Sequence, residues 1–146
     1  MMRDDELCVS KWIRAKREAV FAAFTEPELL RKWFCPRDLQ VISAEADVRV
    51  GGAFRIRMNK GSEVHTVCGN YREVIPGQRL VFSHQWQELD AVTTRVTVEF
   101  SDCDGGTLVS ITQEGFDTRQ SKQSHETGWL SVLENLCEVM SPGGAR

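Results

Sequence analysis

The chain has 146 residues and a mass of 16.5 kDa, which is the size of one folded domain. Hydrophobic residues make up 41% and charged residues 27% of the sequence, which excludes fibrous, low-complexity and disordered proteins. The net charge of −3 argues against a nucleic-acid-binding domain, and no apolar run is long enough to span a membrane. The charged first residues do not resemble a signal peptide. We therefore predict a soluble cytoplasmic protein that binds no nucleic acid.

The chain opens with a strand followed by a helix. Residues 1–6 are predicted to be an N-terminal extension, and the pattern of residues 7–14 favours a strand. Residues 17–24 change to helical spacing, with Val20, Phe21 and Phe24 on one face.

A second short helix starts after Thr25. Thr25 and Glu28 have the spacing of a capping box, and Pro27 suits a first helical turn. Leu30, Trp33 and Phe34 then form its apolar face, and Pro36 ends it because the residue before a proline avoids helical geometry. Two short helices at a sharp angle are expected.

Six strands follow, because apolar and polar residues alternate with period two as far as Gln113. They are predicted at residues 39–47, 53–59, 64–74, 79–86, 93–100 and 107–113. Glycine-containing turns such as Gly51-Gly52 and Pro76-Gly77 connect them. Connections this short require antiparallel neighbours, so the pattern predicts a meander.

The chain closes with a long amphipathic helix at residues 118–140, for which Asp117 is the expected N-cap. Its apolar stripe consists of Trp129, Val132, Leu133, Leu136 and Met140. Residues 141–146 are predicted to be a frayed tail, which leaves residues 7–140 as a single domain.

These elements predict an α+β fold in which a seven-stranded, curved antiparallel sheet wraps around the long C-terminal helix. The long helix is the only element large enough to cover the apolar face of such a sheet, and the two short helices after the first strand would close one end. A curved sheet does not pack flush on one helix everywhere, so a cavity between them is expected.

Six motifs, in order along the chain, resemble one known family. They are residues 20–34 (VFAAFTEPELLRKWF), 47–52 (DVRVGG), 79–82 (RLVF), 96–100 (VTVEF), the Gly106-Thr107 turn, and Gly128-Trp129. Together they are similar to the activator of heat-shock-protein-90 ATPase-like family of the START/Bet v 1-like (SRPBCC) superfamily. The resemblance extends from about residue 11 to residue 136 and implies the helix-grip fold. The sequence departs from the family pattern at Ala15-Lys16, at Cys35, where glycine is common, and at His84, where an aromatic residue is common.

The chemistry-bearing residues show no catalytic or metal-binding pattern. The five cysteines include no CxxC pair, and three scattered histidines lack metal-ligand spacing, so neither a metal site nor a cofactor is predicted. His65 and His125 are expected on the surface, whereas His84 alternates in phase with Leu80 and Phe82 and should point inward. Basic neighbours and a helix C-terminus act oppositely on the Cys35 thiol, so the sequence does not predict its reactivity.

Twelve residues are predicted to line a ligand cavity between the sheet and the last helix. Trp33 and Phe34 would shape its entrance, and His84 would supply polarity. The full set is Phe24, Trp33, Phe34, Phe54, Ile56, Met58, Phe82, His84, Trp86, Val98, Trp129 and Leu133. Filling an ordinary core is the alternative role for each of these side chains.

We therefore expect non-enzymatic binding of a small hydrophobic or aromatic molecule, and no catalytic residue is predicted. The resemblance implies two alternatives: a chaperone-linked interaction protein in the stress response, or a polyketide cyclase-like enzyme that acts by shaping a pocket. Pairing of exposed edge strands could also produce a homodimer.

Overall fold

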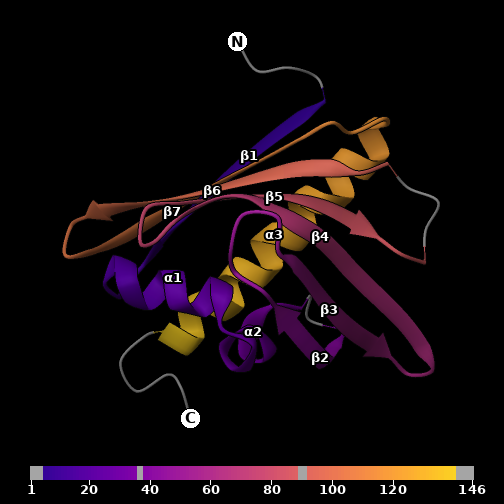
Figure 1. Cartoon of the computed structure of the whole chain (residues 1–146), viewed down its shortest axis with the longest axis horizontal. Helices are drawn as coiled ribbons and strands as arrows, with labels where there is room; N and C mark the ends of the chain where they lie inside the picture. The colour runs from indigo at the N-terminus through magenta and orange to yellow at the C-terminus, as the bar shows by residue number, and fades with distance from the viewer. Residues whose placement is uncertain (1–4, 36–37, 89–91, 141–146) are drawn as a thin grey trace.

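The computed structural model describes residues 5–35, 38–88 and 92–140. Its elements follow the predicted order. They are β1 (Glu6–Ile13), α1 (Arg17–Thr25), α2 (Pro27–Trp33), β2 (Gln40–Ala46), β3 (Ala53–Lys60), β4 (Glu63–Ile75), β5 (Arg79–Trp86), β6 (Thr94–Cys103), β7 (Gly106–Glu114) and α3 (Arg119–Met140). Figure 1 shows α3 crossing the sheet diagonally, with α1 and α2 gathered at one end of the molecule. Pro36 and the predicted tail at residues 141–146 lie outside the described residues.

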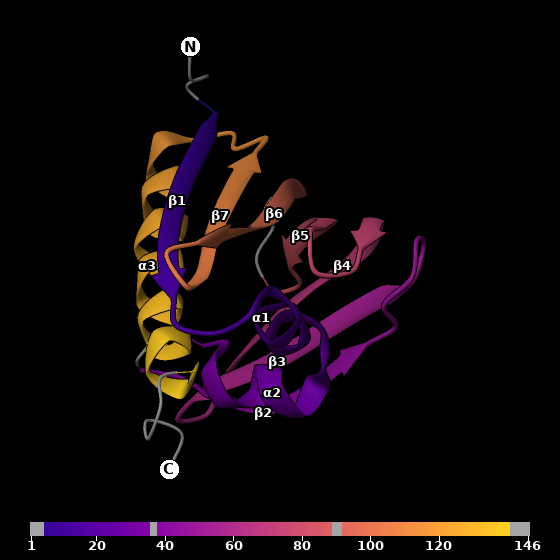
Figure 2. The ribbon, with the colours of Figure 1, turned by 90° about the vertical axis from the view of Figure 1, so that its left-hand side faces the viewer.

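All seven strands form one antiparallel sheet in the order β1-β7-β6-β5-β4-β3-β2. Register shifts between Val41 and Ser43 in β2 and between Tyr71 and Glu73 in β4 mark bulges, which bend a sheet and increase its twist. Figure 2 shows the resulting curvature, with α3 alongside β1 and the sheet curling away toward β3 and β2. The predicted α+β helix-grip architecture is confirmed. β1 and β2 form the sheet edges, and the predicted homodimer through an edge strand stays a prediction.

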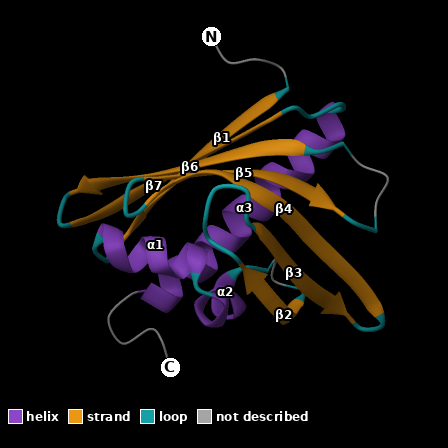
Figure 3. Cartoon of the chain, in the orientation of Figure 1, coloured by secondary structure: helices purple, strands orange, loops and turns teal. Residues whose placement is uncertain are grey.

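The three helices cover the apolar side of the sheet (Figure 3). Alternate residues of the strands point to this side, and in β6 Val96, Val98 and Phe100 are all buried while Arg95 and Glu99 are exposed. From α3, Leu133 and Leu136 are fully buried in the same hydrophobic cluster. One continuous core therefore joins the sheet to all three helices.

The helix starts differ from the sequence prediction by one or two residues. Thr25 belongs to α1 and its hydroxyl donates to the Phe21 carbonyl, so it does not cap α2, whose N-cap is Glu26 without a side-chain bond. Pro27 occupies the first turn of α2 as predicted. At α3 the capping hydroxyl belongs to Thr118, which accepts from the Ser121 N–H at 3.0 Å, and not to Asp117.

Asn135 ties the end of α2 to α3. Phe34 is the C-cap of α2 rather than a residue of the helix, and the chain turns there with ψ 60°. The Asn135 side-chain amide donates to the carbonyls of Cys35 at 2.9 Å and Trp33 at 3.4 Å. Trp33 is the last residue of α2, so its carbonyl has no intrahelical partner, and Cys35 lies just beyond the helix. The bonds fix Phe34 between the two helices.

None of the described helices has the length and hydropathy needed to cross a membrane.

Candidate functional site

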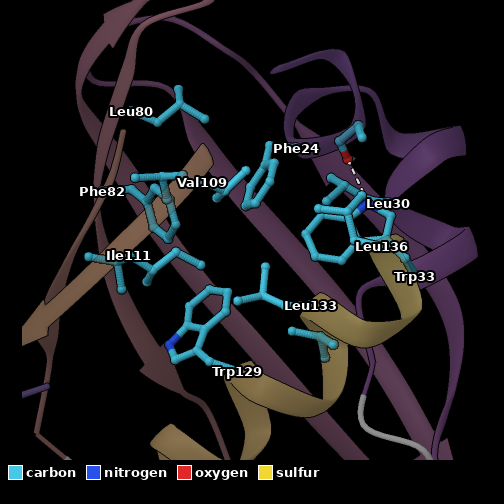
Figure 4. Close-up of a cluster of buried hydrophobic side chains, with 14 of the residues drawn as sticks. Phe24, Leu30, Trp33, Leu80, Phe82, Val109, Ile111, Trp129, Leu133 and Leu136 are labelled. Atoms are coloured by element: carbon cyan, nitrogen blue, oxygen red, sulfur yellow. Dashed lines mark hydrogen bonds between the residues drawn. The ribbon is translucent and has the colours of Figure 1, made fainter. Parts of the chain in front are cut away.

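The inner face of the sheet has one packed half and one open half. In the packed half, α1 contacts β6 and β7, and α2 contacts β2. Trp33 is fully buried there between Phe24 and Phe34, with ring-centroid distances of 4.7 and 5.3 Å. The Trp33 indole N–H donates to the Ala23 carbonyl at 2.9 Å. Figure 4 shows this cluster, with Leu133 and Leu136 of α3 facing the same core. A residual void here, which we call the small void, measures about 20 Å³. That is room for about one water molecule.

The open half contains a cavity of about 240 Å³, which we call the α3 cavity. It lies where the first half of α3 crosses β3 and β5. Its lining residues are Phe34, Met58, His84, Trp86, Ser124, His125, Gly128, Trp129 and Val132. Phe34 contributes to both spaces and therefore separates the small void from the α3 cavity.

Two hydrogen-bond networks lie beside the α3 cavity. In the first, Trp129 donates its indole N–H to Gln113 Oε1 at 2.7 Å. Gln113 Nε2 donates to Thr94 Oγ1 at 2.8 Å and lies 3.4 Å from His84 Nδ1. In the second, Trp86 donates its indole N–H to His125 Nε2 at 3.1 Å, and His125 Nδ1 lies 2.7 Å from the Ser121 carbonyl oxygen. These bonds satisfy both tryptophan N–H groups of the cavity.

His84 is the buried ionisable group of this site, with 5% of its surface exposed. Burial, together with the nearby His125 ring, lowers the pKa of His84 from its ordinary value near 6.5 to about 3. The imidazole is therefore neutral at physiological pH.

The expected surface position of His125 is wrong. It lines the α3 cavity, with its ring centroid 5.6 Å from that of His84 and 5.0 Å from that of Phe116. His65 is likewise half-buried and meets Trp86 edge-on at 6.4 Å. The structure thus brings all three histidines close to Trp86, although they are far apart in the sequence. Within the described ranges, no group of three or more His, Cys, Asp or Glu side chains is placed to hold a metal ion.

The opposite face of the sheet carries a larger but charged hollow of about 750 Å³. There Arg79 contacts Glu73 and Glu99, while Arg95 lies 3.9 Å from Glu114. Most of these charges pair with each other, and Arg72 is a further charged residue of the lining. The hollow has charged walls and no aromatic ring, so the α3 cavity is the better candidate for an apolar ligand.

Comparison with known proteins identifies the family. Residues 14–141 match the sequence model of the Activator of Hsp90 ATPase homolog 1-like proteins. The chain belongs to this AHSA1-like family. No curated protein matches the sequence significantly.

Solved structures of bacterial proteins share the AHSA1-like fold over nearly the whole chain. A protein from Chromobacterium violaceum is 26% identical with a TM-score of 0.87, over 96% of this chain and 99% of its own. An AHSA1 protein from Silicibacter pomeroyi is 24% identical with a TM-score of 0.81, over 90% of this chain and 94% of its own. An AHSA1-like protein from Aeromonas hydrophila is 25% identical with a TM-score of 0.74, over 90% of this chain and 88% of its own.

In this AHSA1-like chain, the twelve residues selected from the sequence fall into three places. Those that line the α3 cavity are Phe34, Met58, His84, Trp86 and Trp129. Those that line the small void are Phe24, Phe34, Phe54, Ile56 and Phe82. Trp33, Val98 and Leu133 are fully buried and line neither space.

Two members of the site network, Gln113 and His125, were missed by the sequence reasoning, although both carry a signal. Gln113 continues the inward phase of Val109 and Ile111 along β7, which makes it a polar residue on an apolar face. His125 stands four residues before Trp129 and therefore on the same side of α3.

The Cys35 thiol is held in its protonated form. It donates to the Leu39 carbonyl at 3.2 Å, and burial raises the pKa of this thiol. Because a thiolate is the reactive form of cysteine, the structure does not favour a nucleophilic role for Cys35.

Proposed function

We propose that this protein binds a small hydrophobic or aromatic molecule in the α3 cavity. The observation that carries the proposal is an unfilled space of about 240 Å³, walled by Phe34, Trp86 and Trp129, in a domain whose other half is tightly packed. Aromatic walls with a few placed polar groups are typical of small-molecule sites. The volume is below the roughly 300–1,000 Å³ of pockets that take drug-sized ligands, which favours a smaller molecule.

Gly128 supports this proposal, because it leaves space where another residue would fill it. It lies inside α3 and lines the cavity, and a Cβ atom added there would meet no atom within 4 Å. A glycine inside a helix destabilises the protein by about 0.5–1 kcal/mol relative to alanine. Ligand binding in the space that Gly128 leaves open would explain why the helix contains this destabilising residue.

A fluorescence assay tests the proposal. Wild-type protein is titrated with N-phenyl-1-naphthylamine, a neutral probe that becomes bright in apolar surroundings. The matched variants are Gly128→Leu, which fills the cavity, and Thr127→Leu, which adds a similar side chain at the preceding exposed position. We expect Gly128→Leu to weaken probe binding about tenfold or more, a loss of about 1.4 kcal/mol, and Thr127→Leu to leave it unchanged. Absence of binding to the wild type, or equal binding by both variants, would contradict the proposal.

Family membership favours a second candidate function. The family description refers to activation of the Hsp90 ATPase, so a chaperone-linked interaction is the alternative proposal. It is tested by measuring the ATPase rate of an Hsp90-type chaperone with and without this protein. Stimulation that survives Gly128→Leu would place that function on a surface other than the α3 cavity.

A further inference from the structure

The two tryptophans of the α3 cavity determine which atoms of the histidines carry hydrogen. An indole N–H can only donate, so the Gln113 atom 2.7 Å from Trp129 Nε1 must be the amide oxygen. The amide nitrogen is then the atom that faces Thr94 Oγ1 and His84 Nδ1. An amide N–H₂ also only donates, so His84 Nδ1 must accept. A neutral His84 therefore carries its hydrogen on Nε2.

The same reasoning applies to His125. Trp86 Nε1 donates to His125 Nε2, so that nitrogen is the acceptor and the hydrogen of the neutral ring is on Nδ1. His125 Nδ1 in turn lies 2.7 Å from the Ser121 carbonyl oxygen, a distance at which it donates. Both nitrogens of His125 are thus already engaged, and this ring offers a ligand no free donor or acceptor.

His84 Nε2–H has no such partner. No hydrogen bond joins this nitrogen to any of the residues that the structure describes. Over the same residues, the one side-chain nitrogen or oxygen that is both fully buried and unpartnered is Arg57 Nε. His84 Nε2 must therefore keep an accessible surface, and the space that His84 lines is the α3 cavity. His84, with 5% of its surface exposed, thus presents an N–H donor inside an aromatic cavity.

The rest of the lining limits what this donor can bind. No lysine or arginine is among the lining residues, so a carboxylate would lose its hydration without a cation to replace it. His125 Nε2 already accepts from an indole, and Gln113 is fully buried behind the lining. The other polar side chain of the lining is Ser124, which is exposed to solvent, so His84 is the buried polar group that a ligand meets. The ring walls of Phe34, Trp86 and Trp129 favour edge and face contacts with another ring.

We propose that the α3 cavity selects uncharged aromatic molecules with a single hydrogen-bond acceptor, such as an aryl ketone, and that His84 Nε2–H binds this acceptor. This inference rests on the proposed function, because it names the ligand class for the same cavity. His84 is accordingly the specificity-determining residue of the site.

Three naphthalene compounds of similar size test the proposal by competition with N-phenyl-1-naphthylamine. 2-Acetylnaphthalene offers a carbonyl oxygen, 2-isopropenylnaphthalene replaces that oxygen with CH₂ at nearly the same shape, and 2-naphthoate is an anion. We expect the ketone to bind about five- to tenfold more tightly than the alkene, the size of one hydrogen bond, and the naphthoate to bind most weakly. In His84→Phe, which keeps a ring but removes the donor, the ketone and the alkene should bind within about twofold of each other.

The outcomes separate this inference from the proposed function. Equal binding of ketone and alkene by the wild type would overturn the role of His84 while leaving hydrophobic binding intact. Tightest binding of naphthoate would overturn the preference for uncharged ligands. Binding of no compound would overturn both proposals.

A second measurement does not depend on any variant. Nitrogen-15 NMR distinguishes the two tautomers of a neutral imidazole, and we expect His84 to show hydrogen on Nε2 and His125 to show hydrogen on Nδ1. Hydrogen on Nδ1 of His84 would overturn the assignment of the donor, even if His84→Phe fails to fold.

Discussion

The two halves of the inner sheet face are built from the same strands, but one is tightly packed and the other contains the α3 cavity. Along β3, Phe54 and Ile56 lie in the packed half and Met58 in the open half. Along β5, Phe82 lies in the packed half and His84 in the open half. The difference arises from what covers each half. In the packed half, α1 contacts β6 and β7 and α2 contacts both β2 and α3. The open half is covered by residues of α3 and by Phe34, and at Gly128 the helix leaves open space. Stability and binding are therefore expected to depend on different residues of one core.

The largest expected effect is the difference in stability between substitutions of two tryptophans, one from each half. Trp33→Ala should lower the free energy of unfolding by about 3–5 kcal/mol, because it leaves a cavity in a fully packed cluster and removes the donor to the Ala23 carbonyl. Trp86→Ala, at a half-buried position beside an existing space, should cost about 1–2 kcal/mol but strongly weaken probe binding. Urea denaturation and the fluorescence titration measure the two quantities. Equal destabilisation by both substitutions would contradict the division of the core.

The next effect is the pH dependence of the free energy of unfolding that arises from His84 in the open half. The unfolded chain binds a proton at this imidazole near pH 6.5, whereas the folded protein resists protonation until about pH 3. Between these values the unfolded state holds more protons, so stability falls as pH falls, by about 1.4 kcal/mol per pH unit. We expect a loss of about 3 kcal/mol from this group on lowering the pH from 6.5 to about 4.

His84→Phe provides the control, because it removes the titrating group and keeps a ring. The difference in unfolding free energy between wild type and variant, measured by urea denaturation across this pH range, should change with the stated slope. A constant difference would show that His84 is protonated equally in the folded and unfolded states.

A smaller effect tests the contact that joins the two halves. Asn135→Ala removes the hydrogen bonds to the carbonyls of Cys35 and Trp33 and should lower stability by about 1 kcal/mol. Because these bonds hold Phe34, which lines both spaces, probe affinity should fall as well. The matched control is Glu134→Ala, also on α3, which removes an ion pair with Lys11 of β1 and should change stability little and binding not at all.

The smallest effect on stability is expected at Gly128, where the substitution should stabilise the protein instead of destabilising it. Gly128→Ala should raise the free energy of unfolding by about 0.5–1 kcal/mol, because alanine favours the helix and its methyl group meets open space. The same methyl group enters the α3 cavity and should weaken probe binding. A variant that gains both stability and affinity would contradict the role given to this glycine.

Sequence periodicity and family resemblance predicted the fold well, because each element repeats its signal over several residues. The alternation in β6 and the apolar stripe of α3 are examples, and the predicted antiparallel meander is confirmed for β2 to β7. The pairing of β1 with β7 closes the sheet and was not part of that prediction. Single-residue features were less predictable. The cap of α3 fell on Thr118 rather than Asp117, since neighbouring residues of both types can cap a helix and the packing of the chain selects one.

The division between core and cavity could not be read from the sequence. Ile56 and Met58 are both apolar, inward-facing and in phase on β3, yet one borders the small void and the other the α3 cavity. The distinction depends on where α2 ends and where α3 crosses, which is a property of tertiary packing. The polar residues Gln113 and His125 were predictable in principle, because each occupies an inward position on its element.

The distribution of the four tryptophans makes the protein its own optical reporter. Trp86 and Trp129 line the α3 cavity, Trp33 is sealed in the packed half, and Trp12 lies near the surface with its N–H bonded to the Cys103 carbonyl. Replacing Trp12 and Trp33 with phenylalanine would leave two emitters, both on the cavity wall. The intrinsic emission of that variant would then follow the occupancy of the cavity directly, without an added dye.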